Sequence, residues 1–286
     1  MSFDAVFSAM TKNAYAKNSA ESDYINQADG LLYCGKCHTP KEKYYPEDIT
    51  RLIGIDRHPG ECKCACEERE RQEKKERDAA RRERIHELRS EAFKGIPAAT
   101  AWRFDNATVK SPQLEKAKTY ADQWNEICNE GIGLLLFGNV GTGKSFAAGC
   151  IANALLDRMI PVLYVRTPDV ISRMQSNFGA DREEYLNKIM SVPLLILDDL
   201  GAERNTSYGK ECVFDVVDRR MMSKKPMIVT TNIPLSAMKE ATDIDERRIY
   251  DRILEKCVPL VFNGENLRNK KAVENTNNAK RLMHLQ

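Results

Sequence analysis

The sequence has little that would place it in a membrane or a secretory pathway. Its longest apolar runs, GLLLF and VPLLIL, fall far short of the roughly 18 residues that a membrane-spanning helix needs. The N-terminal stretch MSFDAVFSAMTKNAYAK lacks the basic start and the continuous apolar centre of a signal peptide. These absences predict a cytoplasmic protein. Disulfides are rare in that compartment, so the nine cysteines need another explanation.

An excess of charge of one sign is also missing. The 286 residues include 44 basic and 42 acidic side chains, which gives a net charge of +2. The overall charge therefore neither predicts nor excludes a nucleic-acid partner, and only a local patch could do so. With 42% hydrophobic residues the chain can build a substantial core, and its length suits one large domain plus a smaller one.

Composition divides the chain into four parts. Residues 1–66 are polar and hold five of the nine cysteines. Residues 67–95 are rich in charge and lack glycine and proline until Gly95, so we expect a solvated connector helix there. A nucleic-acid-binding arm is the alternative, although acidic residues nearly balance the basic ones. Residues 96–270 form the larger domain, and residues 271–286 are a tail with little core signal.

The larger domain alternates short apolar runs with amphipathic stretches. Near-continuous apolar strands separated by helices indicate an α/β fold, in which a five-stranded parallel sheet is covered by helices on both faces. The expected strands are 133–137, 162–166, 193–198, 226–231 and 258–262. The expected helices are 114–130, 144–158, 168–177, 181–190, 209–222 and 246–256.

A glycine-rich loop follows the first expected strand and matches the pattern G-x-x-x-x-G-K-[ST] without a mismatch. Glycines allow the backbone N–H groups to converge on phosphate oxygens, and the following helix points its N-terminus at the same place. We expect the lysine to reach the β- and γ-phosphates and the serine hydroxyl to bind Mg²⁺. The expected nucleotide-binding residues are Gly138, Asn139, Val140, Gly141, Thr142, Gly143, Lys144, Ser145 and Phe146.

Two more expected strands end in polar side chains. The run LLIL is followed by Asp198 and Asp199, and a buried strand that ends in two carboxylates indicates a cation or water beside it. Asp198 is the expected second ligand of the Mg²⁺, and Asp199 the group that polarises the attacking water. Asn232 follows the next strand and would orient the same water if that strand lies between the other two.

Taken together, these motifs resemble the AAA+ ATPases of the DnaC/DnaI helicase-loader group, which are related to the IstB transposition helpers. The resemblance rests on the loop at 138–145, on LILDDLG, on VTTN and on the segment RRIYDRI, and it covers roughly residues 100–270. It implies a P-loop AAA+ core in which Arg252 is an arginine finger and Arg268 a sensor, although either could be an ordinary solvated helix arginine. Asp199 stands where glutamate is usual in AAA+ proteins, so we expect slow or tightly gated hydrolysis.

The segment after the two aspartates resembles, in its placement, the loop of this family that faces the central channel and touches single-stranded DNA. An aromatic ring can stack on a base, and hydroxyl and basic groups can bind phosphates. The candidates are Arg204, Thr206, Tyr208 and Lys210. The alternative is a surface loop that only caps the next helix.

The N-terminal cysteines have the spacing of a metal site. Cys34 and Cys37 form a C-x-x-C pair, and Cys62, Cys64 and Cys66 follow downstream. Four thiolates from two separated turns fit a structural Zn²⁺ site, for which we choose Cys34, Cys37, Cys62 and Cys64. Other members of the set could be Cys66, His38 or His58. Free thiols or a redox pair at Cys34 and Cys37 are the alternatives to zinc.

The resemblance implies an ATP-dependent loader that places a hexameric replicative DNA helicase on single-stranded DNA in replication initiation or restart. It implies ATP and Mg²⁺ as ligands, hydrolysis of ATP to ADP and phosphate, and assembly into a homo-oligomer on ATP binding. The zinc module would dock on the helicase. The alternatives are an IstB-like transposition helper that acts with a transposase on DNA, and a nucleotide-sensing DNA-binding adaptor that hardly hydrolyses ATP.

Overall fold

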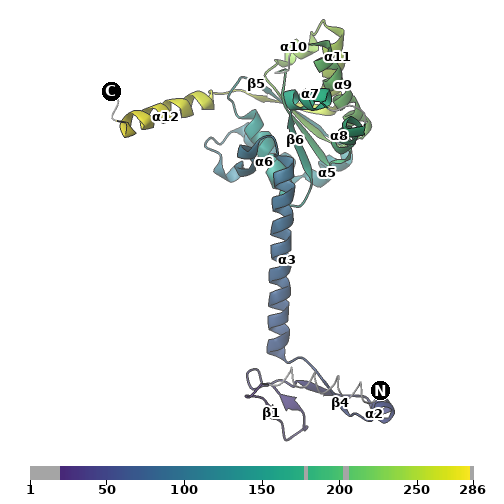
Figure 1. Ribbon diagram of the computed structural model, residues 1–286. Helices are drawn as coiled ribbons and strands as arrows, with labels where there is room; N and C mark the ends of the chain where they lie inside the picture. The colour runs from purple at the N-terminus through teal and green to yellow at the C-terminus, as the bar shows by residue number, and fades with distance from the viewer. Residues whose placement is uncertain (1–19, 177–179, 202–205, 284–286) are drawn as a thin grey trace. The chain divides into compact units, whose positions relative to one another are not determined.

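The computed structural model describes residues 20–176, 180–201 and 206–283. Contacts divide the chain into two compact units, Met1–Arg82 and Glu83–Gln286. The division falls inside one long helix, α3 (Lys63–Ala92), which Figure 1 shows. Within the ranges described, no helix combines the length and the apolar character that crossing a bilayer demands.

The first unit consists of short elements. Two antiparallel pairs form its strands, and one short helix separates the members of the second pair. The elements are β1 (Tyr24–Ile25), β2 (Leu32–Tyr33), β3 (Glu42–Tyr44), α2 (Glu47–Ile53) and β4 (Arg57–Pro59). Among its described residues only Leu31, Cys34 and Cys62 are buried apolar side chains. So small a core needs a further cross-link such as a metal ion.

The charged helix expected from the sequence is confirmed as α3. Residues 67–84 of this helix are all exposed, as its charged side chains require. Its last turns differ, because Leu88 and Ala92 are buried and pack, together with Phe93, in the apolar core of the second unit. The end of α3 is therefore part of the second unit's fold.

The second unit is built on the five-stranded parallel sheet that the sequence predicts. The strand order is β6-β7-β8-β5-β9, and every neighbouring pair is parallel. The strands are β5 (Gly133–Gly138), β6 (Val162–Arg166), β7 (Leu194–Leu200), β8 (Met227–Thr231) and β9 (Cys257–Phe262). The strand β8 lies between β7 and β5. Asn232 follows β8, so it lies between the two strand ends, as its expected role in orienting a water requires.

Helices cover both faces of this sheet, and two short 3₁₀ turns precede them. The 3₁₀ turns are η1 (Pro97–Ala101) and η2 (Phe104–Asn106). The helices are α4 (Pro112–Asp122), α5 (Trp124–Glu130), α6 (Lys144–Leu156), α7 (Thr167–Ser176), α8 (Ala180–Ser191), α9 (Ser207–Met222), α10 (Leu235–Lys239), α11 (Ile244–Lys256) and α12 (Leu267–Leu282). Figure 1 shows α5 to α11 around the sheet and α12 apart from it.

Alternation along the strands divides the core into two layers. Leu134 and Leu136 belong to the layer under α4 and α6, whereas Leu135 belongs to the layer under α7, α8, α9 and α11. Because successive strand side chains point to opposite faces, a continuous apolar run can serve both layers at once. This explains why the strands read as unbroken apolar runs in the sequence.

Two stretches of the chain differ from the expected elements. The stretch 114–130 is two helices, α4 and α5, which break at Gln123. The break lets Trp124 bury its ring near that of Tyr120, with 6.4 Å between the ring centroids. At the C-terminal end, α12 runs through 270–271, where we expected the larger domain to give way to a tail.

Candidate nucleotide site and cysteine cluster

The glycine-rich loop connects the end of β5 to the start of α6, as expected. Gly138, Gly141 and Gly143 have φ angles of 134°, 80° and 97°, a region that other residues rarely adopt. A Cβ atom on Gly138 would lie 2.3 Å from the carbonyl oxygen of Phe262 on β9. The loop therefore needs glycine both for its backbone angles and for its close packing on the neighbouring strand.

Lys144 is the first residue of α6, and its side chain turns back over the loop. Its Nζ donates hydrogen bonds to the carbonyl oxygens of Gly138 at 2.8 Å and Asn139 at 2.6 Å. Burial lowers the pKa of Lys144; Arg268 lowers it as well, while Asp199 and Asp198 act in the opposite direction. The end of β5, which leads into the loop before Lys144, and the end of β7, which carries both aspartates, lie on either side of β8 in the sheet.

The two aspartates lie where the pairing of β7 with β8 shifts register, between Leu197 and Leu200. Asp198 is only 6% exposed, and the hydroxyl of Thr230 donates a 2.6 Å hydrogen bond to its Oδ1. The backbone N–H of Asp199 donates to the same Thr230 hydroxyl at 2.9 Å. One threonine of β8 thus fixes both residues, and no sequence motif identifies it as important.

Asp199 has a φ angle of +63°, which is unusual for a residue other than glycine. Such backbone strain is concentrated at functional sites, and the register shift on β7 accounts for it here. The amide Nδ2 of Asn232 donates a long, 3.4 Å hydrogen bond to Asp199 Oδ1. The structure therefore brings together the ends of β7 and β8 as the sequence predicts.

Ser145 lies in the first turn of α6 and is half-buried. Its carbonyl oxygen accepts a 3.3 Å hydrogen bond from the hydroxyl of Tyr164 on β6. Burial raises the pKa of Tyr164 well above its ordinary value, and the charge of Asp198 adds to this effect. The hydroxyl of this tyrosine therefore stays neutral next to the expected magnesium ligands. The apolar pattern of β6 gives no sign of this role.

Arg252 lies on α11 and makes contacts of its own. Its Nε donates to Asp218 Oδ1 on α9 at 2.6 Å, and its guanidinium lies 4.8 Å from the ring centre of Phe214. These contacts hold the guanidinium against α9 within its own chain. An arginine finger acts on the nucleotide of a neighbouring subunit. The structure of one chain therefore does not distinguish an arginine finger from an ordinary helix arginine at this position.

The expected DNA-binding residues have contacts within the chain. Thr206 accepts a 3.1 Å hydrogen bond from the Gly209 N–H and so caps α9. The hydroxyl of Tyr208 donates to the Met174 carbonyl at 3.2 Å. Lys210 pairs with two carboxylates, at 3.1 and 3.0 Å, on Asp243 and Glu246. Arg204 lies outside the described residues.

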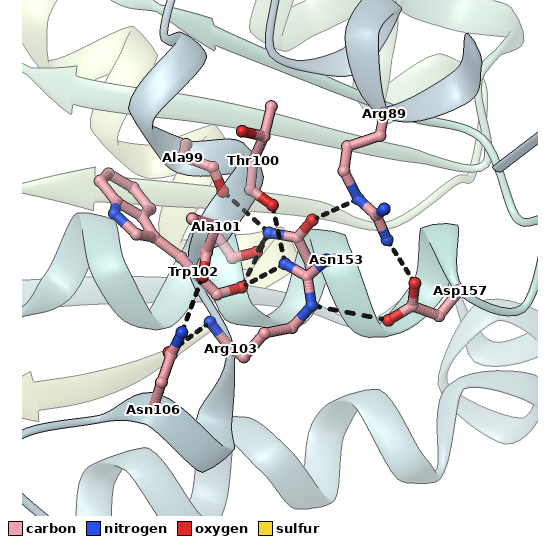
Figure 2. Close-up of polar contacts among 10 residues, drawn as sticks. Arg89, Ala99, Thr100, Ala101, Trp102, Arg103, Asn106, Asn153 and Asp157 are labelled. Atoms are coloured by element: carbon pink, nitrogen blue, oxygen red, sulfur yellow. Dashed lines mark hydrogen bonds and ion pairs between the residues drawn. The ribbon is translucent and has the colours of Figure 1, made fainter. Parts of the chain in front are cut away.

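A network of polar side chains that the sequence did not reveal joins α3 to α6 (Figure 2). Asn153, which is fully buried, donates from Nδ2 to the carbonyls of Ala99, Trp102 and Gly149 at 2.8–3.0 Å. Its Oδ1 accepts a 3.0 Å hydrogen bond from Arg89, which also pairs with Asp157. We call these contacts the Asn153 network. They fix the end of α3 and the turn η1 on the helix that begins at Lys144.

The four chosen cysteines come together in the first unit. The Sγ atoms of Cys34, Cys37, Cys62 and Cys64 all lie within 4.8 Å of one another. Sulfurs held at about 2.3 Å by a tetrahedral zinc ion lie about 3.8 Å apart, so this donor set and spacing fit zinc. A hydrogen bond with the Thr39 hydroxyl lowers the pKa of Cys37 to about 5, which favours the thiolate that a metal requires.

The other possible ligands have different partners. Cys66 bonds to Glu61 Oε2 at 3.4 Å, and His38 Nδ1 lies 3.1 Å from the hydroxyl of Tyr24. His58 Nδ1 lies 3.0 Å from the carbonyl oxygen of Pro59. None of these three belongs to the group of four within the described part of the chain.

Comparisons with known proteins agree with this site. The family model described as IstB-like ATP binding protein matches residues 67–275, which include the glycine-rich loop and both aspartates. The replicative helicase loader DnaC of Escherichia coli K12 is 33% identical over 172 residues, covering 58% of this chain and 69% of DnaC. The replicative helicase loader DnaI of Bacillus subtilis is 26% identical over 264 residues, covering 86% of this chain and 81% of DnaI.

A solved structure supports the fold. The crystal structure of a DnaC helicase loader has a TM-score of 0.51 at 24% identity, and the match covers 58% of this chain and 99% of that one. The family model covers well over half of the chain, and the matched segment contains the loop and strand ends described above. The chain therefore belongs to the family of IstB-like ATP-binding proteins and, within it, to the group of AAA+ ATPases that includes the DnaC and DnaI helicase loaders.

Proposed function

We propose that the protein is an ATP-dependent loader that places a replicative DNA helicase on single-stranded DNA in replication initiation or restart. The observation that carries the proposal is the placement of Lys144 after β5 and of Asp198 and Asp199 at the end of β7, on either side of the central strand β8, within a segment that is 33% identical to a helicase loader. ATP binding and hydrolysis would switch the loader between its helicase-bound and released states.

The chain's own residues suit the binding of a triphosphate. The loop glycines leave backbone N–H groups free to converge on phosphate oxygens, and α6 adds the positive end of its dipole. Lys144 would exchange its bonds to two loop carbonyls for bonds to the β- and γ-phosphates. The Ser145 hydroxyl and the Asp198 carboxylate would hold Mg²⁺, which neutralises phosphate charge when bound.

Hydrolysis requires a positioned water. Asp199 would accept its proton and Asn232 would orient it, since the amide already reaches the carboxylate at 3.4 Å. Aspartate is one methylene shorter than the usual glutamate, so its carboxylate would lie farther from the attacking water. We expect slow hydrolysis that suits a switch, with ADP and phosphate as products.

Assembly would complete the site. Arg252 would extend from one subunit to the γ-phosphate of its neighbour, and release from Asp218 would free its guanidinium for this contact. Arg268 would act within its own subunit, because the neighbouring Leu267 N–H bonds to the Gly141 carbonyl of the glycine-rich loop at 2.9 Å. ATP binding would thereby favour a homo-oligomer.

The first unit would dock on the helicase. With zinc bound by Cys34, Cys37, Cys62 and Cys64, its short strands gain the cross-link that their small core lacks. Cys64 is the second residue of α3, so the metal would also fix the start of the helix that joins the two units. The contact with single-stranded DNA would lie on the second unit.

One observation favours a second function. The matching family model is described as IstB-like, and a transposition helper that acts with a transposase would use the same nucleotide site. A pull-down with the tagged full chain from its source cells, followed by mass spectrometry, separates the two. A co-purified replicative helicase supports the loader, and a transposase without helicase refutes it.

The variant Lys144→Ala tests the nucleotide site. A charged hydrogen bond contributes about 1.5–3 kcal/mol, so we expect ATP to bind at least roughly tenfold more weakly. Lys118→Ala is the matched control, because Lys118 is an exposed lysine on α4. Isothermal titration with ATP and Mg²⁺ measures the affinity, and zinc content and helicase contact should persist in both variants. An unchanged ATP affinity in Lys144→Ala would refute the assignment.

A further inference from the structure

The C-terminal helix α12 packs against very little of its own chain. Every residue whose exposure is described between Arg268 and Met283 is exposed. Figure 1 shows this helix in yellow near the C-terminus. Most helices in globular proteins owe their stability to the burial of one face, and this one buries none in the described chain.

The composition of α12 does not favour a helix on its own. Its sixteen residues, LRNKKAVENTNNAKRL, include four asparagines, a threonine and a valine, all of which are weaker helix formers than alanine or leucine. No apolar stripe runs along it, since Val273 and Leu282 are its only large apolar residues after the first position. A helix that is polar all round is marginal unless something else holds it.

The charge of α12 indicates which kind of partner could stabilise the helix. The helix carries five basic residues and one acidic residue, Glu274, whereas the whole chain is nearly neutral at +2. Basic side chains with interspersed asparagines offer many hydrogen-bond donors to phosphate oxygens. Protein interfaces, in contrast, are depleted of lysine and need an apolar centre that α12 lacks. The complementary partner is a polyanion.

The start of α12 is anchored at the glycine-rich loop. The N–H of Leu267 donates to the Gly141 carbonyl at 2.9 Å. Asn266 caps the helix by accepting from the N–H groups of Arg268 and Asn269, and its side chain lies so close to Gly141 that a Cβ there would be 2.0 Å away. The first turn of α12 is therefore tied to the loop that would bind the nucleotide.

We propose that α12 binds the phosphate backbone of single-stranded DNA, which gives the chain a DNA contact other than the loop before α9. The inference rests on the proposed function, which supplies the nucleic acid. Lys210 is paired with two carboxylates and Tyr208 bonds within the fold, so α12 offers basic groups that the expected loop does not. Because the first residue of α12, Leu267, bonds to Gly141 of the glycine-rich loop, DNA and nucleotide affinities would be linked, and each ligand would alter the affinity for the other.

The test removes charge from the end of α12. The full chain with Lys280→Gln and Arg281→Gln is compared with wild type and with Lys116→Gln/Lys118→Gln, which removes the same charge from exposed positions on α4. Fluorescence anisotropy follows the binding of a fluorescein-labelled oligo(dT) between about 50 and 200 mM salt. Each phosphate contact on a single strand contributes about 0.7 to the slope of log affinity against log salt.

We expect the α12 variant to lose about 1.4 from this slope and to bind about 25-fold more weakly near 0.1 M salt, while the α4 variant matches wild type. An α12 variant that matches wild type overturns the proposal, as does equal weakening of both variants. A changed oligomer mass in light scattering, with unchanged DNA affinity, would instead assign α12 to contacts between copies. ATP affinity and helicase co-purification of the wild-type chain test the proposed function separately.

Discussion

Removing the Asn153 side chain should destabilise the second unit far more than its size suggests. Asn153 is fully buried on α6, and its Nδ2 bonds to three carbonyl oxygens, two of which belong to Ala99 and Trp102 in the segment around η1. Its Oδ1 receives the Arg89 guanidinium from the end of α3 (Figure 2). One side chain thus forms hydrogen bonds with groups from α3, from the segment around η1 and from its own helix α6.

The magnitude follows from the hydrogen bonds that Asn153→Ala removes. The carbonyls of Ala99 and Trp102 lose their bonds from Nδ2, but each keeps one other donor, the Trp102 N–H and the Arg103 guanidinium respectively. A hydrogen bond contributes about 0.5–1.5 kcal/mol, so the two lost bonds together contribute about 1–3 kcal/mol. Arg89 keeps Asp157, and the Gly149 carbonyl lies within α6, so neither adds to this figure. We expect a loss of about 1–3 kcal/mol in the free energy of unfolding.

Urea unfolding followed by tryptophan fluorescence measures this loss. The chain's two tryptophans, Trp102 and Trp124, are both in the unit Glu83–Gln286, so the signal reports that unit. With an m value of about 2–3 kcal/mol per M, the midpoint should fall by about 1 M. Asn125→Ala is the control, because Asn125 is exposed on α5 and accepts one 3.3 Å bond from Arg158. A loss in Asn153→Ala within about 0.5 kcal/mol of this control would refute the reasoning.

Three further predictions concern other parts of the chain. Zinc bound per chain, measured by mass spectrometry of metals, should fall to near zero in Cys34→Ser and stay at one in Cys66→Ser, whose thiol bonds to Glu61. Gly138→Ala should abolish ATP binding in titration calorimetry because its Cβ would meet Phe262, whereas Gly264→Ala, with open space around it, should not. The pKa of Asp243 is lowered, first by the Glu246 N–H and then by Lys210, so its contribution to stability is full above about pH 4 and is lost below it. The difference in urea midpoint between wild type and Asp243→Asn should therefore shrink as the pH falls from 7 towards 3.

The arrangement of the candidate nucleotide site could be predicted because its signals are local. The loop pattern fixes its own backbone, and polar residues after buried strands must meet at one edge of a parallel sheet. The central place of β8 was an assumption in the sequence and is confirmed by the strand order. What the sequence could not provide was Thr230, because a threonine inside an apolar strand looks like any other β-branched residue.

Helix geometry explains why Cys64 and not Cys66 joins the cysteine cluster, which the spacing of cysteines in the sequence does not show. The helix α3 begins at Lys63, so Cys64 and Cys66 lie two helical positions apart. At 3.6 residues per turn these positions differ by about 200° around the axis, and both thiols cannot point to one ion. Cys64 joins Cys34, Cys37 and Cys62, and Cys66 turns to Glu61.

The Asn153 network and the partners of Lys210 could not be predicted from the sequence. Arg89 precedes Asn153 by 64 residues, and Lys210 finds its carboxylates on Asp243 and Glu246, beyond a strand and a short helix. Neither a charged helix nor a polar loop carries a signal for such distant pairs. The sequence therefore contains no sign that Lys210, a candidate for binding DNA, has partners within the chain.

The hydrogen bonds of Thr230 show that the length of the Asp199 side chain is not the only factor that positions its carboxylate. The backbone of Asp199 is held at φ +63° by the register shift of β7 and by its N–H bond to the Thr230 hydroxyl, which itself donates to Asp198. The direction of the Asp199 carboxylate is therefore set by β8 as much as by its own length. Because Asn232 follows the same strand, any shift of β8 moves the expected base, the magnesium ligand and the water-orienting amide together. If the protein hydrolyses ATP as proposed, a small movement of this one central strand would be enough to gate the reaction, and we expect that replacement of Asp199 by glutamate would not by itself make hydrolysis fast.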